Sequence, residues 1–484
     1  MNKRMIIEMT GQIVRLESIL LLLPFIVAII YGEQNCYIAF IAPSIISFVV
    51  GSLMVLYAKP KSKVIYAPDG FAITALAWTI LSLIGALPFV ISGEIKSYTD
   101  AFFETVSGFT TTGASILNNV EALSHATLFW RSFTHFIGGM GVLVLLIAIL
   151  PSSTVRSIHI LRAEVPGPTM GKLVPKMRST SMLLYIIYSG LTILLFIFLV
   201  AGGMPVFDSI VHAFGTAGTG GFGIKADSIG GYSPYIQWVI AIFMVIFGVN
   251  FNVYYLILLK KFKPAIKNNE LWAYLGIITV STILITVNVS PMYNGFGESL
   301  RHSFFQVTSI ISTSGFATTN FDLWPVFSKT ILILLMFSGA CAGSTGGGLK
   351  VSRLVLLYKL IKRSFKTMLH PRSVEVIKLD NKTVDETTLQ SVSVYFALYM
   401  LCVATFLLII CIEPFDFLTN FSAVVSCFNN IGPGLSQVGP TCSFSEYSVF
   451  SKWLLSLAML MGRLEIYPII LATQLFFSER KSKV

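Results

Sequence analysis

Four short clusters of hydroxyl residues and glycine are the parts of this chain whose residue types and spacing could carry chemistry. They read "SGFTTTGAS" at 107–115, "FGTAGTGGFG" at 214–223, "TSIISTSGFAT" at 308–318 and "SCFNNIGPG" at 426–434. Aligned on one glycine each, they share the positions Gly113, Gly220, Gly315 and Gly432. Glycine has no Cβ, so it permits backbone angles at which carbonyl groups point inward. Such clusters could therefore present uncharged oxygens to a ligand.

The chemistry that suits these oxygens is the binding of a monovalent cation. A ring of backbone carbonyls can replace the hydration shell of such an ion. A hard divalent cation usually recruits carboxylates, and no Asp or Glu lies within three residues before any of the four glycines. We therefore predict a selectivity filter whose ion-binding residues are Thr111, Thr112, Gly113, Gly218, Thr219, Gly220, Thr313, Ser314, Gly315, Asn430, Ile431 and Gly432. The alternative is that the small residues only allow close helix packing.

The elements that must position these clusters are membrane helices. Hydrophobic residues make up 55% of the 484 residues and charged residues only 12%, which is too little polar surface for a soluble domain. Apolar runs long enough to cross the ~30 Å hydrocarbon core recur at about 15–32, 37–57, 71–92, 126–150, 182–202, 236–259, 271–290, 327–349, 389–412 and 450–477. The sequence therefore predicts an all-α polytopic membrane protein.

A repeated unit surrounds each cluster. Each cluster follows a short amphipathic segment, too brief to span, at 100–109, 206–217, 298–311 or 416–428. These segments open with Asp100, Asp208, Glu298 and Asp416, and an acidic residue favours a helix N-terminus. A full span precedes and follows each one. We expect four parallel repeats of span, half-helix, pore loop and span around a pseudo-fourfold axis, after two extra N-terminal helices. The expected divisions are 1–68, 69–180, 181–268, 269–385 and 386–484.

The net charge of +11 is explained by membrane topology rather than by nucleic acid. With residue 1 in the cytoplasm, the only outward Lys and Arg are Lys96, Arg131, Lys225, Arg301, Lys329 and Lys452. This asymmetry follows the positive-inside rule and places both termini in the cytoplasm. The inner basic loops could contact anionic membrane lipid, and we expect no nucleic-acid partner.

A glycine-rich segment, "FSGACAGSTGGGLKVSR" at 337–353, interrupts the second span of the third unit. Each glycine costs a helix about 1 kcal/mol relative to alanine, so we predict a flexible loop just below the filter. The alternative is tight packing. The predicted gate residues are Gly343, Gly346, Gly347, Gly348, Lys350 and Arg463. Arg463 is included because an arginine within a span is costly and usually functional. Its neighbour Glu465 lies on another helix face and is a poor partner, and Lys350 could instead extend toward the membrane surface.

Four units with one filter glycine each resemble the Trk/Ktr/HKT superfamily of potassium transporters. The two extra N-terminal spans and "HFIGGMGVLVLLIAILP" at 135–151 resemble its bacterial TrkH/TrkG branch, and the resemblance covers essentially the whole chain. It implies potassium uptake across the bacterial inner membrane, with K⁺ as the substrate and with neither an organic cofactor nor an enzymatic activity. It also implies a homodimer that works with a cytoplasmic nucleotide-binding ring, TrkA.

The same resemblance assigns roles to individual residues. In the superfamily four filter glycines accompany potassium selectivity, and a serine in the first loop accompanies sodium permeation. The segment that matches 343–350 is an intramembrane gating loop, and the arginine that matches Arg463 holds this loop closed and adds an electrostatic barrier. The fourth cluster departs from the pattern, because Asn429, Asn430 and Ile431 replace the hydroxyl run.

Two alternative functions remain open at the level of sequence. A sodium-permeable or cation-coupled symporter of the same superfamily would, if proton-coupled, need an intramembrane acid, and none stands out near the filter. A polytopic membrane enzyme would need clustered His, Asp or Glu on the inner face, where the acids are dispersed. We expect His135 to be a packed, hydrogen-bonded histidine. The basic residues Lys362 and Arg363 are a candidate docking surface for the regulatory ring.

Overall fold

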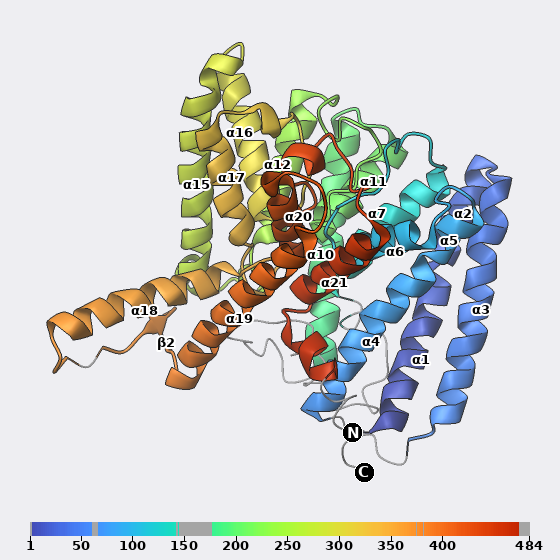
Figure 1. The fold of residues 1–484 in the computed structure, drawn as a ribbon, viewed down its shortest axis with the longest axis horizontal. Coiled ribbons are helices and arrows are strands. Elements are labelled where there is room, and N and C mark those ends of the chain that lie inside the picture. Colours follow the sequence, from blue (N-terminus) through green and yellow to red (C-terminus); the bar gives the residue numbers. More distant parts are fainter. Residues whose placement is uncertain are drawn as a thin grey trace.

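Helices form almost all of the regular structure in a computed structural model of the protein, which describes residues 2–60, 66–141, 144, 177–373, 375–380 and 382–473. Figure 1 shows long helices crossing the molecule, with one helix, α18, projecting away from the bundle. Within the described residues, the strands β1 (Lys378–Leu379) and β2 (Lys382–Thr383) form a short antiparallel hairpin. The expected all-α fold class is confirmed.

The N-terminal region supplies two spans that stand at one edge of the bundle (Figure 1). Its helices are α1 (Lys3–Leu20), α2 (Leu22–Tyr31) and α3 (Gln34–Ala58). A Cβ on Gly11 of α1 would lie only 2.9 Å from the carbonyl oxygen of Gly51 in α3. This pair of glycines therefore lets the two helices approach closely, as small residues do in membranes.

Four groups of helices follow, and each contains a long helix, a short half-helix and a second helix. The first group comprises α4 (Ala67–Gly85), α5 (Leu87–Ile91), α6 (Tyr98–Phe109) and α7 (His125–Met140). The second comprises α10 (Met177–Ala201), α11 (Val206–Gly218), α12 (Pro234–Gly248) and α13 (Phe251–Leu258), followed by the connecting α14 (Phe262–Ile266).

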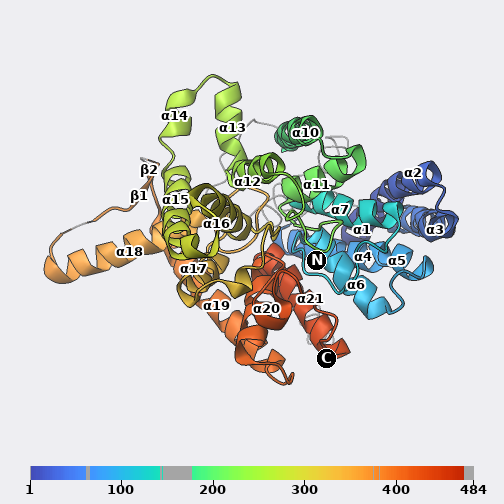
Figure 2. The same ribbon diagram turned by 90° about the horizontal axis from the view of Figure 1, so that it is seen from above.

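The third group comprises α15 (Asn269–Val289), η1 (Ser290–Met292), α16 (Phe296–Ile311), η2 (Phe321–Leu323), α17 (Val326–Phe337) and α18 (Val351–Leu369). The fourth comprises α19 (Glu386–Ile410), α20 (Phe417–Asn429), η3 (Ser436–Val438) and α21 (Val449–Arg463). Seen from above, the four groups surround one centre (Figure 2). The predicted pseudo-fourfold arrangement is confirmed.

The half-helices α6, α11, α16 and α20 lie within two residues of the predicted segments at both ends. Side-chain caps mark the first turns of two of them, α6 and α20. Ser97 accepts a hydrogen bond from the backbone N–H of Asp100, and Asp416 accepts one from that of Thr419. Such caps satisfy backbone donors that have no partner within the helix. All four half-helices pack against the second helix of a neighbouring group: α6 on α21, α11 on α7, α16 on α12 and α20 on α17.

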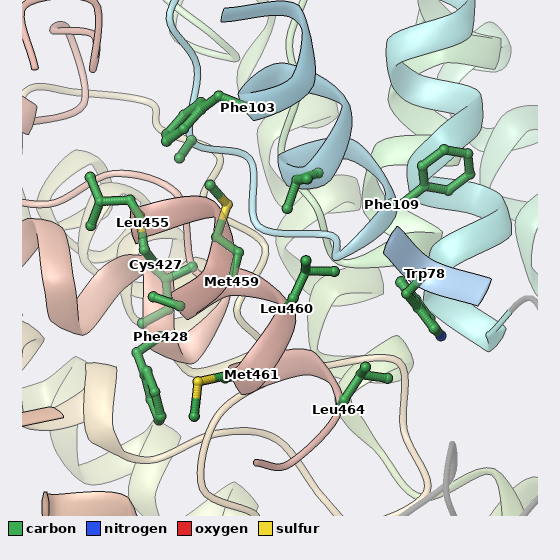
Figure 3. Packing of buried hydrophobic residues seen from close by; sticks show 14 of the residues in the cluster. Trp78, Phe103, Phe109, Cys427, Phe428, Leu455, Met459, Leu460, Met461 and Leu464 are labelled. Atoms are coloured by element: carbon green, nitrogen blue, oxygen red, sulfur yellow. The ribbon is translucent and has the colours of Figure 1, made fainter. Parts of the chain in front are cut away.

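Figure 3 shows this core where the first and fourth groups meet: Phe103 of α6 lies near Leu455 and Met459 of α21, Phe109 of α6 lies on the other side near Trp78 of α4, and Phe428 belongs to α20. All six side chains are buried. The half-helices are therefore part of the core, and the loops at their C-terminal ends are held on a rigid support.

The second helices are less continuous than the sequence predicted. Six helices in the described residues are long and apolar enough to span, and two further pairs would each span if taken together across a bend. The bends are 90° between α12 and α13 and 115° after α21. Runs 236–259 and 450–477, each expected to form one span, are therefore broken by a bend. Only the interruption of run 327–349 was predicted, and the end of run 126–150 lies outside the described residues.

A candidate ion pore

The four loops that follow the half-helices share one backbone conformation. We define them as the filter loops: residues 110–113, 218–221, 312–315 and 429–432. In each, one non-glycine residue is left-handed, with φ of 55° at Thr111, 54° at Thr219, 60° at Thr313 and 56° at Asn430. Two residues later a glycine also has positive φ, 81° at Gly113, 74° at Gly221, 79° at Gly315 and 105° at Gly432.

The ring glycine of the second loop lies one residue later than the sequence alignment placed it. Gly221, not Gly220, is the counterpart of Gly113. The backbone hydrogen bonds agree, because the N–H before each of these glycines donates to the carbonyl five residues earlier. The bonds are Thr112 to Ser107 (2.9 Å), Gly220 to Gly215 (2.9 Å), Ser314 to Ser309 (2.8 Å) and Ile431 to Ser426 (3.0 Å). Two adjacent glycines left the register ambiguous in the sequence, and the predicted Gly218 is the last residue of α11.

The four loops close into a ring through their glycines. A Cβ placed on Gly113 would overlap the carbonyl oxygen of Gly220, and one on Gly221 would overlap that of Ser314. A Cβ on Gly315 would overlap the oxygen of Ile431, and one on Gly432 would lie against that of Thr112. Each loop thus places the carbonyl before its own glycine against the glycine of the loop before it. Only glycine fits here, because any side chain would meet backbone rather than a movable side chain.

The polar side chains of the filter loops bond within and between the loops. The hydroxyls of Thr110 and Thr112 are 2.7 Å apart, and those of Ser312 and Ser314 are 2.8 Å apart. In the fourth loop Asn430 Nδ2 donates to Thr112 Oγ1 (3.0 Å) and to the carbonyl of Met459 (2.9 Å). The asparagine that departs from the hydroxyl pattern therefore joins the fourth loop to the first. The side chains brace the ring and leave its carbonyls as the acceptors.

A buried ion pair supports the first loop. Arg131 of α7 lies 2.7 Å from Glu104 of α6, and neither side chain is more than 2% exposed. Glu104 also accepts hydrogen bonds from Ser115 Oγ (3.0 Å) and the Ile116 N–H (3.0 Å). The guanidinium of Arg131 lies 4.0 Å above the ring of Phe222.

The sequence prediction that no acid stands out near the filter is therefore wrong. Glu104 was present inside the first amphipathic half-helix, but its proximity to Arg131 depends on tertiary packing. Burial of both charges is tolerated because they satisfy one another and the loop backbone.

His135 connects the first and second repeats. Its Nδ1 lies 2.8 Å from the carbonyl of Gly108, and its Nε2 accepts a hydrogen bond of 3.3 Å from the N–H of Phe222. These partners require a neutral ring with the proton on Nδ1. The expectation of a packed, hydrogen-bonded histidine is confirmed.

A cavity of about 190 Å³ lies on the side of the ring formed by the residues that follow the glycines. Its lining includes all four ring glycines, Gly113, Gly221, Gly315 and Gly432. Polar residues from three repeats, among them Ser115, Lys225 and Ser443, complete its wall. The ring is therefore open to a water-sized space on this side.

The predicted interruption at 337–353 is a folded loop on the other side of the ring. We define the gate loop as residues 338–350, between the end of α17 and the start of α18. Its two ends form a neck, in which the Gly339 N–H donates to Leu349 (2.7 Å) and the Val351 N–H donates to Ala340 (3.2 Å). The break in the helix is confirmed.

The tip of the gate loop touches the filter loops. The N–H of Gly347 donates to Thr313 Oγ1 at 2.7 Å. A Cβ on Gly346 would lie 2.9 Å from the carbonyl oxygen of Ser312, and one on Gly347 would lie 2.7 Å from that of Asn429. The run of glycines is explained by this close approach to two half-helix ends. It leaves no space for a side chain between the tip and the ring.

The two predicted cationic gate residues bond to the gate loop. Lys350, 6% exposed, donates from Nζ to the carbonyls of Gly346 and Gly347; it folds back into the loop rather than toward the membrane surface. Arg463 donates to the carbonyl of Thr345 (2.7 Å) and to those of Gly138 (2.6 Å) and Gly139 (2.7 Å).

Arg463 was predicted to lie within the last span, and the structure places it as the last residue of α21, at the bend. Its side chain joins the gate loop to the end of α7. Glu465 pairs instead with Arg353, in agreement with the expected poor geometry toward Arg463. A cavity of about 60 Å³ lies between the gate loop and these groups, and its lining includes Gly343, Gly346, Gly347, Gly348, Lys350, Arg463 and Trp78.

Comparison with known proteins identifies relatives over nearly the whole chain. The family model for TrkH, described as a cation transport protein, matches residues 37–292 and 279–483. The Trk system potassium uptake protein TrkH of Salmonella typhimurium is 37% identical over 486 residues, covering 99% of this chain and 100% of the relative. The TrkG protein of Escherichia coli strain K12 is 36% identical and covers 98% of each chain. The crystal structure of the potassium transporter TrkH from Vibrio parahaemolyticus superposes with a TM-score of 0.87 at 32% identity, covering 97% of this chain and 98% of that one.

Proposed function

Because the chain belongs to the TrkH family of cation transport proteins, which is a transport family and not an enzyme family, we propose that it is the pore subunit of a potassium-uptake system. Relatives named as potassium uptake proteins support K⁺ as the transported substrate. The observation that carries the proposal is the closed ring in which each filter glycine faces the carbonyl of the next loop. Such a ring can exchange the water around a potassium ion for carbonyl oxygens.

The electrostatics of the ring favour a cation. All four half-helices end at the ring, so their negative dipole ends point toward it. Our proposed ion-binding residues are those predicted from the sequence, with Gly221 added as the second loop's ring glycine. A proton-coupled mechanism has less support, because the buried acid beside the filter, Glu104, is already paired with Arg131.

The gate loop is proposed to close the pore. Its tip lies against the filter loops, and Lys350 and Arg463 add two positive charges beside the cavity below. An ion leaving the filter would meet both an obstruction and a repulsive field. Opening requires that Gly347 leave Thr313 and that Arg463 release Thr345.

We further propose that this multi-pass protein lies in the bacterial inner membrane with both termini in the cytoplasm and forms a homodimer. It would be regulated by a cytoplasmic TrkA-like ring docking near Lys362 and Arg363. The relatives' membership of a Trk system and the asymmetry of Lys and Arg support this assignment. The repeats at 69–180, 181–268, 269–385 and 386–484 after an N-terminal region at 1–68 are part of the same proposal.

Rubidium uptake into proteoliposomes, with potassium and sodium as competitors, tests the proposed function. Wild-type uptake should be blocked by potassium and not by sodium. In Gly113→Ser this discrimination should weaken, because the new side chain meets the carbonyl of Gly220. The control is Gly276→Ser on α15, where a Cβ would have no neighbour within 4 Å. Equal competition by sodium in the wild type, or unchanged discrimination in Gly113→Ser, would reject the four-loop potassium filter.

A further inference from the structure

We propose that Glu270 holds the gate loop shut by bonding both sides of its neck, and that it links this neck to the hairpin β1–β2. The proposal rests on the proposed function, because it concerns the gate of that pore. Glu270 lies in the first turn of α15, outside the ring and outside the residues predicted as the gate. It is therefore a positioning residue, which acts through the loop and touches no ion.

A single carboxylate oxygen of Glu270 receives two backbone donors. The N–H of Ala342 donates to Oε1 at 2.7 Å, and the N–H of Ser352 donates to the same atom at 2.9 Å. Ala342 lies just inside the neck on the incoming side, and Ser352 is the second residue of α18 on the outgoing side. The side chain is 5% exposed, so water competes little for these bonds.

The neck needs this support because its own bonds are few. The gate loop contains several glycines, which are costly to order, and its two ends are joined by the backbone bonds at Gly339 and Val351. The N-cap residue of α18, Lys350, makes no side-chain capping bond. Glu270 supplies the missing acceptor from another helix, and a carboxylate at a helix N-terminus is favoured by the helix dipole. Charged acceptors also make the stronger hydrogen bonds.

The residues next to Glu270 hold the hairpin. The backbone N–H of Asn269 donates to Asp380 Oδ1 at 2.7 Å, and Asn268 Nδ2 donates to Asp380 Oδ2 at 3.2 Å. Asp380 lies in the turn between β1 and β2. The hairpin is also tied to α18, since Lys359 Nζ donates to the carbonyl of Lys378 at 2.7 Å.

One helical turn therefore bonds to the gate loop on one side and to an outlying hairpin on the other. In both views the hairpin lies beside α18, away from the centre of the four groups (Figures 1 and 2). A partner that moves the hairpin would pull on Asn268 and Asn269, and this displacement would reach Glu270 within one residue. The first turn of α15 is thus the shared element through which a regulator could open the neck.

Two substitutions separate the geometry of Glu270 from its charge. Glu270→Asp keeps the charge but shortens the side chain, so that it cannot reach both donors. Its potassium-sensitive rubidium uptake without any partner should rise several-fold over wild type. Glu270→Gln keeps an oxygen acceptor at the same reach but loses the charge, so its uptake should rise less than that of Glu270→Asp. Both variants should keep the wild-type preference for potassium over sodium, because the ring is unchanged.

The link to the hairpin is tested by Asp380→Ala, with the neighbouring exposed Asp385→Ala as the control, since Asp385 makes no side-chain capping bond. Asp380→Ala should raise uptake and Asp385→Ala should not. The double variant Glu270→Asp with Asp380→Ala should raise uptake by less than the product of the two separate increases, because both changes act on one element. If Glu270→Asp misfolds, Asp380→Ala still provides an independent measurement, because it changes a partly exposed side chain.

The outcomes distinguish this inference from the proposed function. Potassium-selective uptake in wild type with no increase in Glu270→Asp or Asp380→Ala overturns the inference alone. Equal increases in Glu270→Asp and Glu270→Gln also overturn it, because the hydrogen bonds would then not be what holds the loop. Absence of potassium-selective uptake in the wild type rejects the proposed function itself.

Discussion

At the scale of single residues, the second filter loop shows what the sequence could and could not predict. The residue types and their fourfold recurrence predicted the loops correctly. The ring glycine of the second loop was misassigned, because Gly220 and Gly221 are adjacent and identical in type. The positive φ at Gly221, the backbone hydrogen bond from Gly220 to Gly215 and the contact of Gly221 with Ser314 distinguish them.

The two glycines should therefore respond differently to a second mutation. Gly220→Ala places its Cβ against the imidazole of His135, whereas Gly221→Ala places it against the backbone carbonyl of Ser314. Both should reduce rubidium uptake at least tenfold. His135→Ala should restore part of the uptake to Gly220→Ala and none to Gly221→Ala, because only the first obstacle is a side chain. Rescue of Gly221→Ala by His135→Ala would contradict the corrected register.

The ion pair beside the first loop gives a prediction about stability. Glu104→Gln leaves Arg131 as a buried, uncompensated charge, which typically costs about 3–5 kcal/mol. The thermal midpoint of the purified protein in detergent should fall accordingly. The double variant Glu104→Gln with Arg131→Met removes both charges and should regain most of the loss. If the double variant is less stable than Glu104→Gln, the pair does not act as the coupled unit that the 2.7 Å distance indicates.

At the scale of elements, the half-helices were predictable and two of the helix breaks were not. Acidic residues mark the half-helix starts, and the small polar clusters mark their ends. Averaged over a spanning window, hydropathy stays high enough across Gly248 and Arg463 for each run to count as one span, so it did not locate the breaks. The break after α12 follows from tertiary bonds: the Cys341 N–H donates to Gly248, and the Phe251 N–H donates to Gly343. The backbone groups freed by the break are thus satisfied by the gate loop.

We expect Arg463 to hold the gate loop in its closed position. Arg463→Ala removes three hydrogen bonds to the carbonyls of Thr345, Gly138 and Gly139 and one positive charge beside the lower cavity. Uptake of rubidium without a partner should rise by tenfold or more, with potassium still preferred over sodium. Arg372→Ala, at an exposed position, is the control and should leave uptake unchanged. A fall in uptake in folded Arg463→Ala would show that the arginine supports the open pore instead.

At the scale of the whole molecule, the basic residues that mark the predicted inner side include two on a helix that projects from the bundle. The sequence predicted the inner side from its basic loops, and the structure places α18 with Lys362 and Arg363 on an arm that projects from the bundle (Figure 1). The projection itself could not be predicted, since the sequence after the run at 327–349 indicated only a basic segment on the inner side. Exposed apolar residues on the same helix, among them Tyr358, Ile361 and Phe365, suit a surface that is covered by another protein.

Charge reversal on this arm tests where a cytoplasmic regulator docks. In Lys362→Glu with Arg363→Glu, activation of uptake by an added TrkA-like ring should be lost. Uptake without the ring should stay within about twofold of wild type, because neither residue contacts the gate loop. The matched control is Lys260→Glu with Lys261→Glu, which reverses two exposed charges on a separate basic loop between α13 and α14. If the ring were held only by nonspecific attraction, both double variants would weaken activation equally, because such attraction depends on total surface charge. Loss confined to the α18 variant would identify the arm as the docking surface, and full activation of that variant would place the ring elsewhere.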